Sequence, residues 1–240
     1  MADYVSAGRT DTGRVRRLNE DAVLLRDDLG LWVVADGLGG HSAGDYASHL
    51  LTERLGQLQR PDDLVDFIDA IEDTLVQVNA DLRRTAIERQ VDLIGSTVAL
   101  LVHHRDYMLC GWVGDSRVYC FEDRHLRRAT KDHAHGADDE DEEVTQYGGR
   151  PAPQPGGGVL TRAIGAEEEL YVDWVVASSK PGSQFLLCSD GVNKEMTDRE
   201  LEAEFLNDTP PTKLIGNIFE TSLARGARDN VSAIVVRLTA

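Results

Sequence analysis

The sequence lacks the long apolar runs that mark membrane-spanning and exported proteins. None of its apolar segments approaches the roughly 20 residues that a membrane-spanning helix needs. The N-terminal stretch MADYVSAGRTDTGR contains no apolar signal segment. We therefore expect a free-standing cytoplasmic protein that does not act at a membrane.

Cysteine is scarce, and the few cysteines are placed unfavourably for cross-linking. Cys110, Cys120 and Cys188 are far apart in the sequence and form no C-x-x-C pair. This spacing argues against a disulfide scaffold and against a structural zinc ribbon. Each cysteine sits in an apolar, strand-like run, so we expect all three to pack in the core.

Positive charge is outweighed by negative charge. The chain has 25 Lys and Arg against 42 Asp and Glu, a formal net charge of −17. The block DDEDEE at 138–143 supplies only a minority of this excess, so the rest is spread over the surface. A chain this acidic is repelled by nucleic acid and by anionic lipid, which argues against a nuclease.

Short runs rich in Val, Leu and aromatic residues predict strands. They cover residues 22–25, 31–35, 96–102, 107–113, 117–121, 171–177, 184–188 and 231–238. Several are separated by only a few polar residues or glycines, which predicts antiparallel hairpins and meanders.

Apolar residues at spacings of three and four predict two helices between the strand clusters. One follows the glycines after Asp36, and a longer one starts near Pro61. Late in the chain, Thr197 and Glu200 form a candidate capping box, and another helix closes on Gly226. Strands and helices do not alternate one for one, so the pattern favours an α+β fold over a doubly wound parallel sheet.

The stretch around 130–158 stands apart because it has almost no apolar periodicity. It combines the acidic block with prolines and a triple glycine. We expect a mobile acidic and Gly/Pro-rich surface segment at about 133–158. The length of 240 residues by itself allows one large domain or two small ones.

Acidic residues recur where the predicted strands begin or end. They are Glu20 and Asp21 before 22–25, Asp36 after 31–35, Asp115 between 107–113 and 117–121, Asp190 after 184–188, and Asp229 before 231–238. Each alone is explained as a turn residue that bonds nearby backbone groups. If the strands pack side by side, however, these carboxylates converge and repel one another, and bound cations would relieve the repulsion.

The chemistry of this ligand set selects the metal. Oxygen ligands without His or Cys favour Mg²⁺ or Mn²⁺ over Zn²⁺. Two such ions about 3.5–4 Å apart can hold a bridging water, lower its pKa and clamp a phosphoryl group. Arg14, Arg16 and Arg17 lie just upstream of Glu20, and a guanidinium can grip two phosphate oxygens. For Arg14 and Arg17 we favour a solvated turn instead.

Six segments in order resemble one enzyme family. VRRLNEDAV, VADGLGGHSAGDYAS, GWVGDSRVY, LTRAIG, LLCSDGV and ARDNVSAIVV span nearly the whole chain. They resemble the metal-dependent (PPM, type 2C) protein serine/threonine phosphatases, specifically their compact bacterial branch. The resemblance implies a single catalytic domain over 1–240, folded as a four-layer α-β-β-α sandwich with two central antiparallel sheets flanked by helices.

The resemblance also implies a reaction and its partners. Phosphoserine and phosphothreonine on proteins are hydrolysed by direct attack of a metal-bridging water, without a covalent enzyme intermediate. The cofactors are two Mn²⁺ or Mg²⁺ ions, with a third, weaker site. The expected partners are phosphorylated proteins, among them a cognate serine/threonine kinase and its substrates. A monomer is favoured.

Roles are carried over by position. Asp36 resembles the ligand that bridges both metals, with the Gly37 carbonyl beside it. Glu20 resembles a ligand of the second metal, supported by Asp21 in the outer shell. Two further residues resemble ligands of the first metal, namely Asp190 and Asp229. Arg16 matches the phosphate-gripping arginine, and Asp115 matches the position that shares the third metal with Asp190.

The sequence departs from the family at two places. Leu38 follows Asp36-Gly37, where many eukaryotic members carry a histidine proposed as general acid. Bacterial relatives also lack this histidine. His41 is a possible substitute, although a structural role at the helix entry is favoured. In the segment 133–158, the family's ordered flap is replaced, so the third metal's flap ligand stays open among Asp138, Asp139 and Asp141.

Other readings fit less well. A cysteine-based phosphatase needs C-x5-R spacing, which neither Cys110 with Arg117 nor Cys188 provides. A zinc hydrolase would rest on His133 and His135 alone, and the glycine-rich turn lacks the Lys-Ser/Thr ending of a nucleotide site. A catalytically inactive relative that serves as a binding module remains an alternative, and the full set of core carboxylates argues against it.

Overall fold

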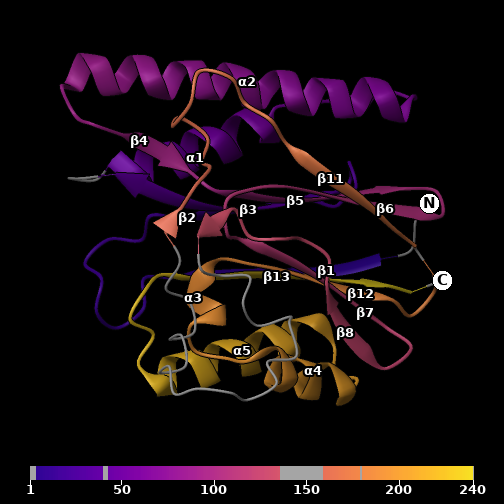
Figure 1. Cartoon of the computed structure of the whole chain (residues 1–240). Helices are drawn as coiled ribbons and strands as arrows, with labels where there is room; N and C mark the ends of the chain where they lie inside the picture. Colours follow the sequence, from indigo (N-terminus) through magenta and orange to yellow (C-terminus); the bar gives the residue numbers. More distant parts are fainter. Residues whose placement is uncertain (1–3, 40–42, 136–158, 179, 240) are drawn as a thin grey trace, which may run out of the picture.

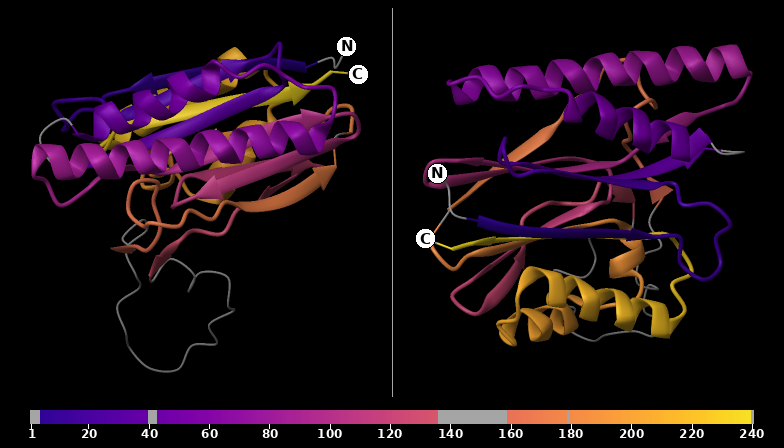
Figure 2. Two further views of the ribbon diagram at one scale, coloured as in Figure 1. Left: turned by 90° about the horizontal axis from the view of Figure 1, so that it is seen from above. Right: turned by 180° about the vertical axis from the view of Figure 1, so that it is seen from behind.

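The computed structural model describes residues 4–39, 43–135, 159–178 and 180–239. Figure 1 shows four layers, with two sheets stacked face to face and helices covering both outer faces. Figure 2 shows the same order of layers from behind. The predicted four-layer α-β-β-α sandwich is confirmed.

The first sheet has six strands and lies under the first two helices. Its order is β11-β6-β5-β3-β2, with β4 paired to β3. The strands are β2 Asp21–Arg26, β3 Leu31–Gly39, β4 Ile94–Ser96, β5 Val98–His104, β6 Tyr107–Val113 and β11 Asp173–Ser178. The helices on its outer face are α1 Ala43–Gly56 and α2 Leu64–Arg89.

The second sheet has five strands in the order β1-β13-β12-β7-β8. They are β1 Tyr4–Asp11, β13 Val231–Leu238, β12 Gln184–Cys188, β7 Arg117–Glu122 and β8 His125–Arg128. The helices on its outer side are α3 Asp190–Asn193, α4 Asp198–Leu206 and α5 Pro211–Arg225. A separate antiparallel pair joins β9 Ala134–His135 to β10 Val159–Leu160.

Strand β3 is buried on both faces because it lies in the middle of the stack. Leu31 and Val33 face α1 and α2, while Trp32 and Val34 alternate toward the second sheet. Burial on both sides explains why this run is continuously apolar. The strand therefore holds the residue that follows its apolar part, Asp36, on a rigid support.

Helix boundaries follow local capping chemistry. Helix α2 begins at Leu64 rather than near Pro61, because the Asp63 carboxylate caps it by accepting the Val65 N–H. The predicted capping box of Thr197 and Glu200 starts α4, and Gly226 ends α5. The three cysteines are buried and unpaired, as expected.

Two elements near the site escaped the sequence patterns. Strand β1 has a largely polar and exposed sequence, and it forms because β13 offers a partner along its whole length, from Tyr4 opposite Leu238 to Asp11 opposite Val231. Helix α3 is a single turn, too short for a periodic signal. The predicted strand at 96–102 is divided at Thr97 into β4 and β5.

In the described part of the chain, no helix combines the length and apolarity needed to cross a membrane.

Candidate active site

Strand ends from both sheets bring acidic residues to one edge of the sandwich. In the first sheet, Asp21 stands directly opposite Asp36 in the β2–β3 pair. In the second, β12 leads into α3 at Asp190, and its neighbour β13 begins two residues after Asp229. The stacking of the two sheets places these residues within electrostatic reach of one another.

The pKa of Asp36 is affected by the other aspartates of the acidic group. Its pKa is raised well above the usual value, first because the carboxyl is buried and then because of nearby negative charge. The charges that raise it belong to Asp21, Asp190, Asp115 and Asp229, in decreasing order of effect. Four carboxylates from distant parts of the sequence therefore act on the carboxyl group of Asp36.

The backbone of Asp36 is fixed on both sides. Its carbonyl accepts the Thr97 N–H at 2.8 Å and the Ser96 hydroxyl at 3.1 Å. The Thr97 hydroxyl accepts the Asp36 N–H at 3.3 Å and also bonds Ser116 at 2.7 Å. The main chain of Asp36 is held by neighbouring strands, which leaves its carboxylate available for the site.

Asp21 is almost fully buried beneath the group, with 2% of its surface exposed. Its Oδ2 accepts the Ser189 hydroxyl at 2.8 Å, while its Oδ1 has no hydrogen-bond partner among the described residues. Burial raises its pKa to about 6, Asp190 and Asp229 add to the rise, and hydrogen bonds from Ser232 and Ser189 partly offset it. A buried carboxylate oxygen without a partner is a costly arrangement.

Gly37 and Gly44 make room for Glu20. A Cβ on Gly37 would lie 2.0 Å from the Gly44 carbonyl oxygen, and a Cβ on Gly44 would lie 2.7 Å from both Glu20 Oε1 and the Gly37 carbonyl oxygen. The two glycines therefore let the Glu20 carboxylate and the Gly37 carbonyl approach each other. Burial raises the pKa of Glu20, against the opposing effects of Arg16 and the Gly44 N–H.

Asn230 ties the loop after β1 to the start of β13. Its Oδ1 accepts the Glu20 N–H at 2.8 Å, and its Nδ2 donates to the carbonyls of Thr12 and Leu18, both at 2.9 Å. The Asn230 side-chain amide thus anchors, by hydrogen bonds, the loop that carries Arg16 and Glu20. The loop geometry depends on pairing of β1 with β13, so no local sequence signal identified Asn230.

Arg16 reaches Asp229 with two parallel contacts. Its Nε lies 2.8 Å from Oδ1 and its Nη2 lies 3.0 Å from Oδ2. Half of the Arg16 side chain remains exposed, with a relative exposure of 50%. A bidentate guanidinium at the rim of the acidic group can also meet an incoming phosphate.

Lys194 is a functional candidate that the motifs did not reveal. Its Nζ lies 2.5 Å from Asp190 Oδ2 and 2.9 Å from Asp229 Oδ2. Burial raises the pKa of Asp229, but Lys194 and Arg16 outweigh it and leave that pKa lowered. The i, i+4 spacing from Asp190 to Lys194 was the available signal, once α3 is recognised as a helix.

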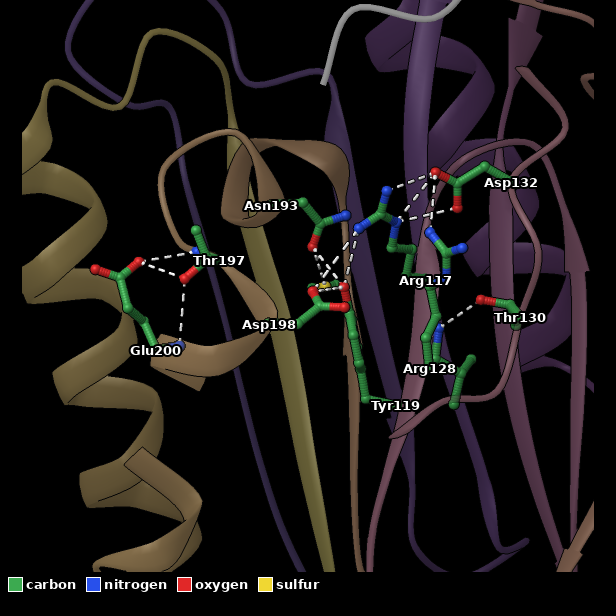
Figure 3. A network of polar contacts seen from close by, with 11 residues as sticks. Arg117, Tyr119, Arg128, Thr130, Asp132, Asn193, Thr197, Asp198 and Glu200 are labelled. Carbon is green, nitrogen blue, oxygen red and sulfur yellow. Dashed lines mark hydrogen bonds and ion pairs between the residues drawn. The ribbon is translucent and has the colours of Figure 1, made fainter. Parts of the chain in front are cut away.

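Asp115 lies in the turn between β6 and β7, next to a buried polar network. Its pKa rises to about 6 because of burial and the charges of Asp190 and Asp132. Figure 3 shows Arg117 between Asp132, at 2.7 Å, and the Tyr119 hydroxyl, at 3.1 Å. The Tyr119 hydroxyl in turn donates to Asp198 at 2.8 Å, so the network links the Asp115 turn to the start of α4.

The predicted segment at about 133–158 lies mostly outside the described residues, as do His41, Asp138, Asp139 and Asp141. Its first residues are described. His133 accepts the Gly114 N–H through Nδ1 at 3.0 Å, and its Nε2 lies 2.9 Å from Asp173. His133 is thus occupied by contacts that hold the chain beside the Asp115 turn.

Across the described ranges, no three His, Cys, Asp or Glu side chains already stand in an arrangement that would hold a metal ion. Two of the predicted ligands are in ion pairs instead, Asp229 with Arg16 and Lys194, and Asp190 with Lys194. The structure brings the predicted ligands into one neighbourhood without assembling them into a cage.

Comparisons with known proteins identify the family of the chain. A family model described as Protein phosphatase 2C matches residues 12–225. The serine/threonine phosphatase stp of Listeria monocytogenes is 29% identical, and the alignment covers 95% of this chain and 93% of that protein.

Two solved structures are also similar. The structure of PppA, described as a key regulatory component of T6SS in Pseudomonas aeruginosa, has a TM-score of 0.87 and 37% identity, over 98% of this chain and 97% of that one. The catalytic domain of PstP, in complex with 2 manganese ions, has a TM-score of 0.83 and 26% identity, over 99% of each chain. Because the family model spans most of the sequence and the folds coincide, the chain belongs to the protein phosphatase 2C family, as its six motifs predicted.

Proposed function

We propose that this chain hydrolyses phosphoserine and phosphothreonine on proteins with the help of two divalent cations. The observation that carries the proposal is the group of carboxylates brought together at Asp36, where burial first and then the neighbouring negative charges raise the pKa. The relatives named as serine/threonine phosphatases support the choice of substrate.

The donor set fits divalent metal ions. Asp21 Oδ1 and Asp190 Oδ1 are buried without hydrogen-bond partners among the described residues. Among the described residues, the charges that raise the Asp36 pKa belong to carboxylates, and carboxylate oxygens favour Mn²⁺ or Mg²⁺. The manganese in the similar PstP structure supports the same choice.

Each predicted ligand has a place in this scheme. Asp36 would touch both ions, Glu20 and the Gly37 carbonyl would hold the second, and Asp190 and Asp229 would hold the first. Asp21 would support them from below through its bond to Ser189. When bound, the ions supply positive charge to the phosphoryl group and acidity to a water molecule, which makes that water a nucleophile near neutral pH.

The chain itself positions the phosphate. Arg16 is exposed enough to meet a phosphate while its loop is held by Asn230. Leu38 replaces the histidine proposed as general acid in other members, so the chain offers no side chain for that role at this position. Asp115, with Asp190, would hold a third and weaker ion, since the charge of Asp190 raises the Asp115 pKa.

The partners follow from the chemistry. A phosphoprotein phosphatase counteracts a kinase, so we propose a serine/threonine kinase and its substrates as the phosphorylated partners. The net charge of −17 disfavours nucleic acid as the substrate. The cytoplasmic location and the monomeric state stay predictions from the sequence.

The metal requirement is tested with a phosphothreonine peptide. We expect activity with Mn²⁺ that EDTA abolishes, and a loss of at least about 10³-fold in kcat for Asp36→Asn and Asp190→Asn, because each loses charge that stabilises the transition state. Asp28→Asn, at an exposed carboxylate on another part of the surface, is the control.

Two results would redirect the proposal. Activity that survives chelation contradicts a metal-dependent mechanism. A correctly folded wild type that binds Mn²⁺ but hydrolyses no phosphopeptide favours an inactive relative that serves as a binding module.

The phosphate-gripping role belongs to Arg16 alone. We expect Arg16→Ala to lower kcat/KM by about 10- to 100-fold, mainly through KM, because a bidentate contact to phosphate is lost. Arg17→Ala removes the same charge from the neighbouring exposed position and should stay within about twofold of wild type. Equal effects of the two substitutions would show that only net charge matters here.

The buried carboxylates make the metal-free protein sensitive to pH. In the folded chain Asp21 keeps its proton up to about pH 6, whereas the unfolded chain releases it near 3.8. The stability from this group is therefore present below about pH 4 and lost as the pH rises to about 6.

We expect Asp21→Asn to remove this loss of folding stability at higher pH, because asparagine does not ionise. In EDTA, the free energy of unfolding of the variant relative to wild type should increase by on the order of 3 kcal/mol between pH 4 and pH 7, since one pKa unit corresponds to about 1.4 kcal/mol. Urea denaturation at a series of pH values measures it, with Asp28→Asn as the control. A difference that does not change with pH would refute the raised pKa of the buried Asp21 carboxyl.

A further inference from the structure

Lys194 lies between two predicted ligands of the first metal. Its Nζ is 2.5 Å from Asp190 Oδ2 and 2.9 Å from Asp229 Oδ2. One ammonium thus pairs with two carboxylates that the first metal would also need. None of the six motifs assigns a role to this lysine.

The Asp229 carboxylate and the Asp190 backbone are both held by contacts other than the lysine ammonium. Asp229 is already held by the bidentate Arg16 contact, and its Oδ1 also accepts the Asn230 N–H at 3.0 Å. Asp190 is fixed by its place at the start of α3, whose Lys194 N–H closes the turn onto the Asp190 carbonyl at 2.8 Å. What Lys194 adds through its side chain is positive charge.

The Lys194 side chain can also move away from the two carboxylates into solvent. Lys194 keeps 29% of its surface exposed, so its flexible stem can carry the ammonium into solvent. A divalent ion offers each carboxylate a stronger partner than a single ammonium at similar distance, because the attraction scales with charge. Binding of the metal and retention of the lysine contacts therefore oppose each other, because both bring positive charge to the same two carboxylates.

We propose that Lys194 is an internal competitor of the first metal, which stabilises the metal-free site and weakens its affinity for Mn²⁺. This inference rests on the proposed metal site. It shifts occupancy of the first position to a higher Mn²⁺ concentration than the carboxylates alone would require.

The test compares Lys194→Met and Lys194→Gln with wild type in the full chain. Isothermal titration with Mn²⁺ should show about tenfold or tighter binding to one of the two sites in both variants, since both lose the competing charge. In EDTA, their melting temperature should fall by roughly 3 °C or more, and saturating Mn²⁺ should close that gap. Lys180→Met, which breaks the surface pair with Glu122, is the matched control and should leave Mn²⁺ affinity unchanged.

The outcomes separate the two proposals. If wild type binds no Mn²⁺ by titration, the metal site itself fails. If wild type binds Mn²⁺ but the Lys194 variants bind it equally or more weakly, the lysine positions the ligands or plays no part, and competition is refuted. A melting temperature lowered equally with and without Mn²⁺ also refutes it, because a purely structural lysine would act in both states.

Discussion

The structure depends on the repulsion between carboxylates that the fold forces together. Asp21 starts β2, Asp36 lies within β3 and Asp190 starts α3. Burial removes the water that would screen these carboxylates. A protein of modest stability keeps such an arrangement only if something else stabilises it. In the described residues two cations, Arg16 and Lys194, provide part of the compensation, and divalent ions would provide the rest.

The rigid sandwich holds the carboxylates together in spite of their repulsion. Strand β3 is clamped between the helices α1 and α2 on one side and the second sheet on the other, so Asp36 cannot move away from its neighbours. The glycines at 37 and 44 allow main chain and Glu20 to come close where any side chain would collide. The rigid strands and the two glycines, which have no side chains, together define the position of the predicted ligands.

The predictable part of the molecule was the part encoded locally. Continuous apolar runs identified β3 and β12, the capping box identified α4, and Asp36 and Asp190 stood out because each ends such a run. These signals were enough for the α+β class, and the motif order was enough for the family.

The rest could not be predicted because it depends on contacts between distant segments. Strand β1 exists only through its pairing with β13, and Asn230 reaches Thr12 and Leu18 only because of that pairing. Lys194 follows a helix of one turn, α3, which is too short to give a periodic pattern in the sequence. His133 was grouped with a segment of weak pattern, although the Gly114 N–H and Asp173 hold it.

Diffraction from crystals grown with Mn²⁺ decides whether this acidic group holds two metal ions. We expect two anomalous peaks about 3.5–4 Å apart, both in contact with Asp36, one also reaching Glu20 and the other Asp190 and Asp229. A map without manganese at these carboxylates, with the ion pairs of Arg16 and Lys194 intact at saturating Mn²⁺, would contradict this expectation.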